Sequence, residues 1–511
     1  MNRLKAKALT KVADHAWGFD QRHRTIALLT EAVRRDPTNP EILLSLATAV
    51  GKQRDYKRAE ELLDRVLQLA PRKASLHQRV ARTYAEIDRP DRAVECYQRS
   101  LELNRDISAT VATLLELAAL YERRHQLDDA SAAVAEALTR EPASELAQLQ
   151  QAILDRRMRD SARCETTLRS LVANTSNSWP VRAQAWYELA QLLDDQQQYD
   201  EAFQALIAAK QLMIPHAASA RSQNQDTLLR NAQLVESLDK ACYEGWQKVA
   251  EHDTPFRLAA LTSHPRSGTT LIEQLLDSHD EVISADEFDV FSRWVFIPIV
   301  RKFRHSVPIL TALEHVPAAV RQMARATYWQ QTEAILNQSF GERMLVDKNP
   351  GMMILMPVIN WAFPEMKMLI ALRDPRDVVL SCFMQKVPLT PISSNWLSLS
   401  EAADYYTRVM KTWLTVRGLT QSPWLEFRYE DVVVDLEREA HRILEFLGLP
   451  WDDRVLKFYE HAREKLVRSP TYKDVTQPVY QRSVGRWQNY AKHLEPIQAA
   501  LQPFVKEFGY E

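Results

Sequence analysis

Residues 257–287 read RLAALTSHPRSGTTLIEQLLDSHDEVISADE, and this stretch decides the fold of the second half of the chain. Its apolar run 258–263 is short and predicts a buried strand. Apolar residues then recur at helical spacing, at Leu271, Ile272, Leu275 and Leu276. The loop between them, residues 264–270, combines one glycine with several hydroxyl side chains. A strand, a tight loop and a helix N-terminus form a phosphate cradle, because backbone N–H groups and the helix dipole point at the anion.

This loop differs from the phosphate loop of nucleotide triphosphatases, whose pattern is GxxxxGK[ST]. Ser263 stands where that pattern has its first glycine, and Thr269 stands where it has lysine. The lysine would grip the β- and γ-phosphates, whereas here Arg266 brings the positive charge from another position. A nucleotide kinase or ATPase is therefore the disfavoured alternative.

Two later segments place basic residues beside predicted strands. MLVDKNPGM puts Lys348 after a short apolar run, where a lysine can stabilise negative charge on a leaving group. In KMLIALRDPRDVVLSCF, the run 368–372 predicts a strand, Arg373 leaves its end, and Ser381 lies two turns along the following helix. An arginine can hold a phosphate through two parallel hydrogen bonds. The alternatives are that Lys348 is a surface lysine that caps an element and that Arg373 makes a plain ion pair at the strand end.

The N-terminal half repeats at a fixed period of about 34 residues. Ala59 and Ala93 occupy the same phase of two neighbouring units, and Pro37 and Pro71 close successive units at the same spacing. This spacing, with a small residue where two helices cross, resembles the tetratricopeptide pattern over residues 20–215. Stacked helix pairs share one core and leave a concave groove. We expect that groove to hold a peptide or partner protein; the alternative is a rigid support for the second domain or for a dimer.

The composition agrees with a helical first half. Only three of the ten glycines precede residue 250, and helices need fewer glycines than the tight loops of a sheet domain. We therefore expect a multidomain chain, with an all-α tetratricopeptide-repeat solenoid at 1–215, connecting helices at 216–250 and an α/β domain at 251–511. The connection 216–250 contains no flexible Gly/Ser linker, so the halves should be coupled.

Charge and cysteine usage exclude several classes of protein. A formal net charge of −2 argues against a mainly electrostatic nucleic-acid binder. Four cysteines without CxxC spacing argue against a disulfide framework and a zinc ribbon, and fit a reducing, cytoplasmic location. We see no signal peptide and no apolar run long enough to span a membrane. No cluster of His, Asp or Glu has metal-ligand spacing, so no metal is expected.

The loop PRSGTTL resembles the 5′-phosphosulfate-binding loop of sulfotransferases, which use 3′-phosphoadenosine 5′-phosphosulfate (PAPS). It is close to the form found in tyrosylprotein sulfotransferases and in bacterial proteins that join tetratricopeptide repeats to a sulfotransferase domain. The resemblance covers about residues 255–511 through five separated segments. It implies a P-loop-like α/β sulfotransferase domain with a parallel sheet. It also assigns the donor-binding loop to five consecutive residues: Arg266, Ser267, Gly268, Thr269 and Thr270.

The same resemblance implies roles for residues further along the chain. Glu287 stands at the family's spacing after Arg266 and matches the catalytic base, which takes the acceptor proton. Lys348 matches a catalytic lysine at the leaving group, and Thr471 matches a hydroxyl residue, usually serine, beside the transferring group. The remaining matches are nucleotide contacts: Arg373 and Ser381 at the 3′-phosphate, Tyr429 and Arg486, with a weaker expectation for Arg482 and Ser483.

Two positions depart from the tyrosylprotein pattern. Asp289 stands where those enzymes have the first of two basic residues that read an acidic peptide, whereas Arg293 fits the second. Gln385 replaces a further basic residue near the 3′-phosphate. The resemblance still favours sulfation of a protein or peptide tyrosine, and a homodimer is a separate expectation. A carbohydrate or small phenol acceptor, and a scaffold that has lost activity, remain the alternatives.

Overall fold

The computed structural model describes residues 2–18, 22–53, 55–250, 255–285, 287–302, 307–336, 338–464 and 483–511. The chain forms two compact units, Met1–Leu192 and Leu193–Glu511. Each unit has its own core, and each is described by itself below.

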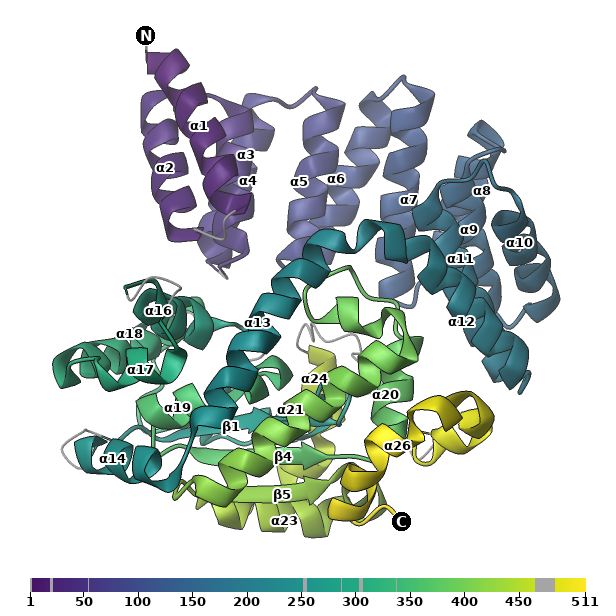
Figure 1. Ribbon diagram of the computed structural model, residues 1–511. Coiled ribbons are helices and arrows are strands. Elements are labelled where there is room, and N and C mark those ends of the chain that lie inside the picture. The colour runs from purple at the N-terminus through teal and green to yellow at the C-terminus, as the bar shows by residue number, and fades with distance from the viewer. Residues whose placement is uncertain are drawn as a thin grey trace. The chain divides into compact units, whose positions relative to one another are not determined.

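The first unit is a row of helices that pack in consecutive pairs, α1 with α2, α3 with α4, and so on to α9 with α10 (Figure 1). The helices are α1 (Asn2–Gly18), α2 (Arg22–Arg35), α3 (Pro40–Gly51), α4 (Tyr56–Leu69), α5 (Ala74–Glu86), α6 (Pro90–Leu103), α7 (Ile107–Arg123), α8 (Leu127–Arg140), α9 (Glu145–Arg157), α10 (Ser161–Ala173) and α11 (Trp179–Asp195), the last of which runs into the second unit. This arrangement confirms the predicted helical repeat array.

Small residues lie where the helices cross, as the repeat pattern predicts. Ala59 and Ala93 are both fully buried. Gly51 packs so closely that an added Cβ would lie 2.7 Å from Cγ2 of Ile87. The turns inside the pairs also repeat, because residues with positive φ recur there at Asp88, His125, Arg159 and Gln197. These residues are 34 to 38 positions apart, so the repeat is visible in the backbone as well as in the side chains.

Helix α12 (Tyr199–Met213) packs within the second unit, although its sequence resembles a repeat helix. Phe203 stacks on Phe383 of α20 (Pro375–Met384) with ring centroids 5.4 Å apart. Asp200 pairs with Lys492 at 2.6 Å. Periodicity identifies the apolar face of a helix but not the partner that covers it, so the boundary predicted at residue 215 remains a prediction.

The predicted connection 216–250 is helical. It contains α13 (Ala218–Ser237) and α14 (Lys240–Ala250), preceded by the 3₁₀ turn η1 (Ile214–His216). Side chains of α13 are bonded to the second unit: Asn224 donates to Oδ1 of Asn395 at 2.8 Å, and Asn231 donates to the carbonyl of Ile354 at 2.6 Å. Helix α13 is therefore a wall of the second unit.

The second unit is built on five parallel strands in the order β2-β3-β1-β4-β5. The central strand pairs on both sides, with Leu261 opposite Lys348 on β3 and opposite Leu369 on β4. This confirms the predicted parallel sheet. The strands are β1 (Leu258–Thr262), β2 (Val282–Ser284), β3 (Met344–Lys348), β4 (Lys367–Leu372) and β5 (Trp424–Arg428).

Helices cover both faces of this sheet, as a parallel sheet requires. Alternate strand residues, such as Ala259, Leu261 and Leu369, join one core cluster with α15 (Thr269–Asp277), α23 (Leu436–Leu447) and α24 (Phe458–Glu464). On the other face, Asn360 of α19 (Met356–Ala362) contacts Met368, and Trp413 of α21 (Leu399–Leu419) donates to Glu426 at 2.6 Å.

The second unit contains further helices and helical turns. They are the π-helical turn η2 (Ser292–Phe296), α16 (Ile297–Lys302), α17 (Ile309–Glu314), α18 (Ala318–Leu336), η3 (Pro350–Leu355), η4 (Ser393–Leu397), α22 (Tyr429–Val434), η5 (Asp453–Lys457), η6 (Arg486–Tyr490) and α26 (Ala491–Glu507). No helix in the described ranges has both the length and the apolar character needed to cross a bilayer.

Candidate active site

Each of the five strands delivers one predicted site residue at or just past its carboxyl end. The loop 263–268 follows β1 and Glu287 follows β2, while Lys348 ends β3. Arg373 follows β4, and Tyr429 follows β5. Because all five strands are parallel, these ends meet at one edge of the sheet, where α/β proteins bind their ligands. Segments far apart in the sequence are brought together by topology alone.

The loop after β1 has the backbone of a tight anion cradle. Arg266 and Gly268 both have positive φ, at 74° and 95°. Gly268 caps α15, and a Cβ added there would lie 2.6 Å from Cδ2 of Tyr429. Glycine is therefore required at position 268 for two reasons: the backbone is left-handed, and the Tyr429 ring leaves no room for a Cβ. The first amides of the nine-residue α15 have no partner within the helix, which suits them to an anion.

Arginine side chains from two strands form one cluster beside this loop. Nε of Arg266 donates to Oγ of Ser381 at 3.0 Å, and Arg373 donates to the carbonyl of Arg266 at 3.1 Å. The Arg373 guanidinium lies 4.9 Å from the centroid of the Tyr429 ring. Arg373 is only 8% exposed, and its Nε has no hydrogen-bond acceptor among the described residues. A buried, unsatisfied guanidinium donor fits an anionic ligand.

The structure brings Arg266, Ser381, Arg373 and Tyr429 together, but Arg486 has another partner. Its guanidinium pairs with Asp194 at 2.6 Å, and the Tyr490 hydroxyl donates to the same carboxylate at 2.5 Å. The nearby Ser483 reaches the cluster through its backbone, because its carbonyl accepts from Arg373 at 2.5 Å. Thr471 and Arg482 lie outside the described residues.

The other side of the edge holds the predicted base and the predicted leaving-group lysine in direct contact. Nζ of Lys348 lies 2.5 Å from Oε1 of Glu287 and 3.2 Å from Oε2 of Glu273. Lys348 is fully buried and the Glu273 side chain is 2% exposed, whereas the Glu287 side chain is 44% exposed. The Ser284 hydroxyl donates to Glu273 at 2.6 Å. The lysine is thus anchored from inside by one carboxylate, and the other carboxylate remains accessible to a substrate.

Asp347 precedes Lys348 and points to the opposite face of the strand. Tyr328 donates to its Oδ2 at 2.6 Å. Burial raises the pKa of the Asp347 carboxyl to about 7, and the hydrogen bond from Tyr328 opposes that rise. The Asp347 carboxyl therefore gains or loses its proton near neutral pH, although it lies on the opposite face of the strand from Lys348.

His264 and Cys382 support the loop as neutral groups. The His264 ring bonds the carbonyl of Pro265 at 2.8 Å, and burial lowers its pKa to about 4. Cys382 is buried with its Sγ 3.8 Å from the same carbonyl, and burial raises the pKa of its thiol to about 12. A neutral thiol is a poor nucleophile, which agrees with a packing role for Cys382.

Three polar residues of the site were missed by the sequence analysis. Glu273 lies inside the apolar run of α15, and an acid at such a position was a usable signal of a buried ion pair. Asp194 gave no signal, because it pairs with a residue 292 positions away. Lys210 is 3% exposed beside the Phe383 ring, and burial lowers the pKa of its ammonium to about 7.

No group of three or more His, Cys, Asp or Glu in the described ranges is arranged to hold a metal ion. The arrangement instead offers cationic and amide donors on one side and a carboxylate on the other. Such a site can bind a phosphorylated donor and remove a proton from an acceptor.

Comparisons with known proteins agree with both halves of this description. Residues 260–453 match the model described as the sulfotransferase family, and residues 52–116, 12–74 and 149–212 match tetratricopeptide repeat models. An uncharacterized protein of Aquifex aeolicus is 27% identical over 64% of this chain and 42% of its own length. Protein-tyrosine sulfotransferase A of Caenorhabditis elegans is 24% identical over 48% of this chain and 65% of its own length. The chain thus spans less than two thirds of either relative.

Among solved structures, the sulfotransferase domain from the Synechococcus PCC 7002 olefin synthase is 20% identical to this chain. The match covers 51% of this chain and 97% of that domain, with a TM-score of 0.37.

Proposed function

A sulfotransferase-family domain follows tetratricopeptide repeats in this chain, and from this premise we propose that it transfers a sulfuryl group from PAPS to an acceptor hydroxyl. The observation that carries the proposal is the meeting of two sets of groups at one sheet edge. Arg266, Ser381 and Arg373 form a cationic cluster, and Glu287 and Lys348 lie in contact. A scaffold without activity would have no need to keep both sets.

The described residues fit the proposed donor. The Gly268 cradle would be filled by any Cβ, which suits close approach of a phosphate to backbone amides. The loop Arg266–Thr270 would hold the 5′-phosphosulfate, while Arg373 and Ser381 would hold the 3′-phosphate. Tyr429 packs against Gly268 and Arg373, and would line the nucleotide site. For Arg486 to contact the nucleotide, its pair with Asp194 would have to open.

The proposed reaction is an in-line displacement at sulfur. The acceptor oxygen forms a new S–O bond as the S–O bond to the 5′-phosphate breaks. Glu287 receives the acceptor proton, for which its exposed carboxylate is suited. Lys348, together with Thr471, stabilises the negative charge on the departing phosphate oxygen, and Arg266 steadies the charge of the transition state. One well-placed donor of this kind contributes roughly 3–4 kcal/mol to lowering the barrier.

For the acceptor we propose a tyrosine in a protein or peptide. The matching relatives include protein-tyrosine sulfotransferases at 24% identity, and the repeats provide a surface for a polypeptide. Asp289 at a position expected to be basic argues that the peptide need not be acidic. A carbohydrate or small phenol remains the second candidate.

We further propose a reducing, cytoplasmic location for the protein, because all four cysteines are free. The homodimer remains a prediction.

Calorimetry with 3′-phosphoadenosine 5′-phosphate and with ATP tests the donor site directly. We expect tight binding of the former, and a weaker signal with ATP. Arg373→Ala should weaken that binding at least tenfold, because it removes the buried unsatisfied donor. Unchanged affinity in this variant would refute the assignment of Arg373, and preference of the wild type for ATP would favour a kinase.

A transfer assay tests the reaction and the acceptor class together. Labelled PAPS is incubated with a proteome extract and, separately, with a glycan panel. Label on tyrosine residues supports the proposal, whereas label on glycans alone selects the second candidate. Tight nucleotide binding without transfer to any of these acceptors would select the inactive scaffold.

A further inference from the structure

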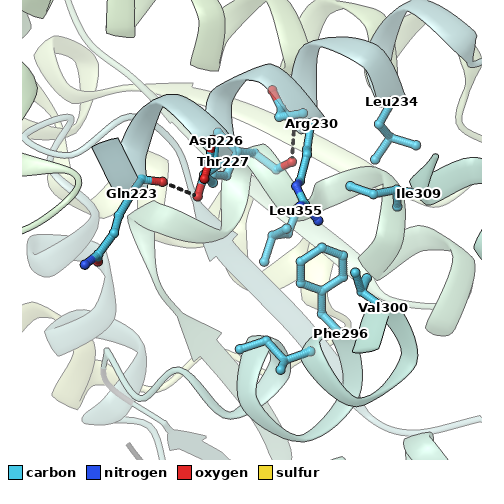
Figure 2. A pocket seen from close by; sticks show the side chains of 12 residues that line it. Gln223, Asp226, Thr227, Arg230, Leu234, Phe296, Val300, Ile309 and Leu355 are labelled. Atoms are coloured by element: carbon cyan, nitrogen blue, oxygen red, sulfur yellow. Dashed lines mark hydrogen bonds between the residues drawn. The ribbon is translucent and has the colours of Figure 1, made fainter. Parts of the chain in front are cut away.

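A cavity of about 310 Å³ opens beside the second unit's connecting helix α13 (Figure 2). Its floor is apolar, and Figure 2 shows Phe296, Val300, Ile309 and Leu355 converging on it. Its opposite wall is one face of α13, from which Arg230 extends toward the ring of Phe296. A volume of this size is at the low end of the roughly 300–1,000 Å³ of ligand sites, which is enough for one compact apolar group.

Two walls of the cavity continue directly from the reacting residues. The π-helical turn η2 begins five residues after Glu287 and supplies Phe296. The 3₁₀ segment η3 begins two residues after Lys348 and supplies Leu355. Neither Glu287 nor Lys348 lines the cavity itself. The cavity is therefore joined to the acceptor side of the site by two short segments of chain, and it is distinct from the reacting centre.

The third wall is regular. The residues that α13 contributes follow the spacing i, i+3, i+4, i+7, i+8 and i+11, which is one continuous helix face. They are Gln223, Asp226, Thr227, Arg230, Asn231 and Leu234. Asn231 is fixed at both ends of its amide, since it donates to Ile354 and its Oδ1 accepts from Thr412 at 3.2 Å. These bonds hold α13 against the floor, so the cavity is formed before any ligand binds.

The π-helical geometry of η2 is a second sign of function. Such turns insert one extra residue into a helix, are less stable than regular α-helix, and occur frequently at functional sites. Here the turn lies at the start of α16, and its residue Phe296 and the following Ile297 both face the cavity. Ile297 remains 38% exposed, so an apolar surface is left open to solvent at the mouth.

We propose that this cavity is an acceptor subsite that takes one apolar side chain of the peptide, close in sequence to the hydroxyl residue that is sulfated. The inference rests on the proposed function and adds a specificity to it. The apolar floor receives the side chain. Gln223, Asp226 and Arg230 at the α13 wall offer donors and acceptors to the peptide backbone beside it.

The size and position of the cavity favour a peptide over a small phenol. A small phenol would fit at Glu287 and Lys348 without reaching a separate cavity. An extended peptide spans about 3.3 Å per residue, so a side chain a few residues from the tyrosine can reach a second site. The groups at the α13 wall carry both signs of charge and amide character, which matches a peptide backbone rather than a strongly charged partner.

The experiment fills the cavity with a large side chain that is introduced at an exposed position of α13. Thr227 is an exposed residue on the lining face of α13, and its hydroxyl bonds only within the helix, to the carbonyl of Gln223 at 3.1 Å. Thr227→Trp should occupy the cavity without disturbing the core. Gln225→Trp is the matched control, because Gln225 is exposed on the opposite side of the same helix and does not line the cavity.

The probe is a set of fluorescent peptides with one central tyrosine in a Gly/Ser background, with a single leucine scanned from four residues before it to four residues after it. For the wild type with bound 3′-phosphoadenosine 5′-phosphate, we expect one or two leucine positions to tighten binding at least fivefold over the leucine-free peptide. Thr227→Trp should abolish that gain and leave nucleotide affinity unchanged, while Gln225→Trp should preserve the gain. A leucine gain that survives Thr227→Trp, or no gain at any position, overturns the subsite.

Transfer from PAPS is measured in parallel, so the two proposals can fail separately. With transfer intact, Thr227→Trp should raise KM for the best leucine peptide and leave kcat and the KM of the leucine-free peptide unchanged. A leucine gain in binding that Thr227→Trp removes, without transfer by any variant, would uphold binding of an apolar peptide side chain in the cavity but refute the proposed activity, and with it the role of the cavity as an acceptor subsite. Wild-type transfer with equal KM values for all peptides would uphold the activity and refute the subsite.

Discussion

The proposed donor side and the proposed acceptor side of this sheet edge are built in different ways. On the donor side, Ser267 and Arg373 are at least 90% buried. Arg373 donates to the carbonyl of Arg266, and the Arg266 side chain donates to the hydroxyl of Ser381. On the acceptor side, the Glu287 side chain is 44% exposed and is held by an ion pair with Lys348. For the proposed function, the contrast predicts a preformed donor site beside an acceptor site that is more open to solvent.

The largest effect should come from Glu287→Gln. The variant keeps a hydrogen-bond acceptor for Lys348 but cannot take the acceptor proton, so kcat should fall by about 10²–10⁴-fold. Affinity for 3′-phosphoadenosine 5′-phosphate should stay within twofold, because the donor side is separate. Asp289→Asn is the matched control, since it neutralises a neighbouring acid. Near-normal turnover in Glu287→Gln would remove this residue from the mechanism.

Lys348→Met tests the residue that the two sides share. Removing one leaving-group donor should lower kcat by roughly 10²–10³-fold. It also leaves Glu273 buried without its cation, which should lower the free energy of unfolding by about 3–5 kcal/mol. Urea denaturation measures the second effect.

The double variant Lys348→Met/Glu273→Gln separates the two consequences. It removes the uncompensated buried charge, so stability should recover while transfer stays low. Recovery of transfer together with stability would show that Lys348 acts only as a structural partner of Glu273.

Gly268→Ala tests how rigid the donor side is. A left-handed backbone costs an alanine roughly 1–2 kcal/mol, and the new methyl would meet the Tyr429 ring. Affinity for 3′-phosphoadenosine 5′-phosphate should fall by about tenfold or more, by calorimetry, with little change in peptide binding. Gly341→Ala is a control for strain alone, because it also has positive φ but nothing lies within 4 Å of its added Cβ. Equal nucleotide affinity in wild type and Gly268→Ala would contradict a tight cradle.

The smallest effect on sulfuryl transfer is expected for Asp347, which lies behind the shared lysine and whose charge instead affects stability. Its pKa in the folded protein is about 7, above the usual value of about 3.9, so the folded state holds this proton more tightly than the unfolded chain. Its contribution to stability is therefore present below about pH 4 and is lost as pH rises to about 7. Asp347→Asn should remove this pH-dependent loss in the free energy of unfolding, which amounts to at most about 1.4 kcal/mol per pH unit.

Urea denaturation at pH 5 and pH 8 checks the sign for Asp347. The asparagine variant should gain stability over the wild type on going from pH 5 to pH 8. Tyr328→Phe should raise the pKa of Asp347 in the folded state, because it removes the hydrogen bond that favours the charged carboxylate. The stability contribution of Asp347 should then persist to higher pH. An identical pH dependence in wild type and Asp347→Asn would exclude a raised pKa.

Much of the fold could be predicted from local pattern. The strand predicted at 258–263 is β1 (Leu258–Thr262), and the strand predicted at 368–372 is β4 (Lys367–Leu372). Short apolar runs followed by Gly, Pro or Asp are strong local signals, and the regular recurrence of small residues and prolines made the helical array readable. Arg266, Arg373 and Ser381 could be placed beside predicted strands from the sequence pattern, whereas their roles and the choice of Tyr429 were implied by the family resemblance.

Long-range partners could not be predicted in the same way. Arg486 was expected at the nucleotide, yet it pairs with Asp194 from the end of α11. The contact between Glu287 and Lys348 joins residues 61 positions apart. Neither ion pair can be predicted from periodicity or from neighbouring residues. The sequence around a charged residue is the same whether its partner is water, a ligand or another side chain.

The parallel sheet and the roles of the groups at its edge were implied by the family resemblance. The amino-acid sequence by itself determined the helical repeats and the short apolar strands. These depend on backbone preferences and on the spacing of apolar residues, which act over a few positions. Only the tertiary structure decided that Lys348 is buried between two carboxylates, that α12 packs with the second unit, and that α13 closes a cavity beside the acceptor side. Burial and pairing arise from the packing of distant segments, and no stretch of sequence carries that information alone.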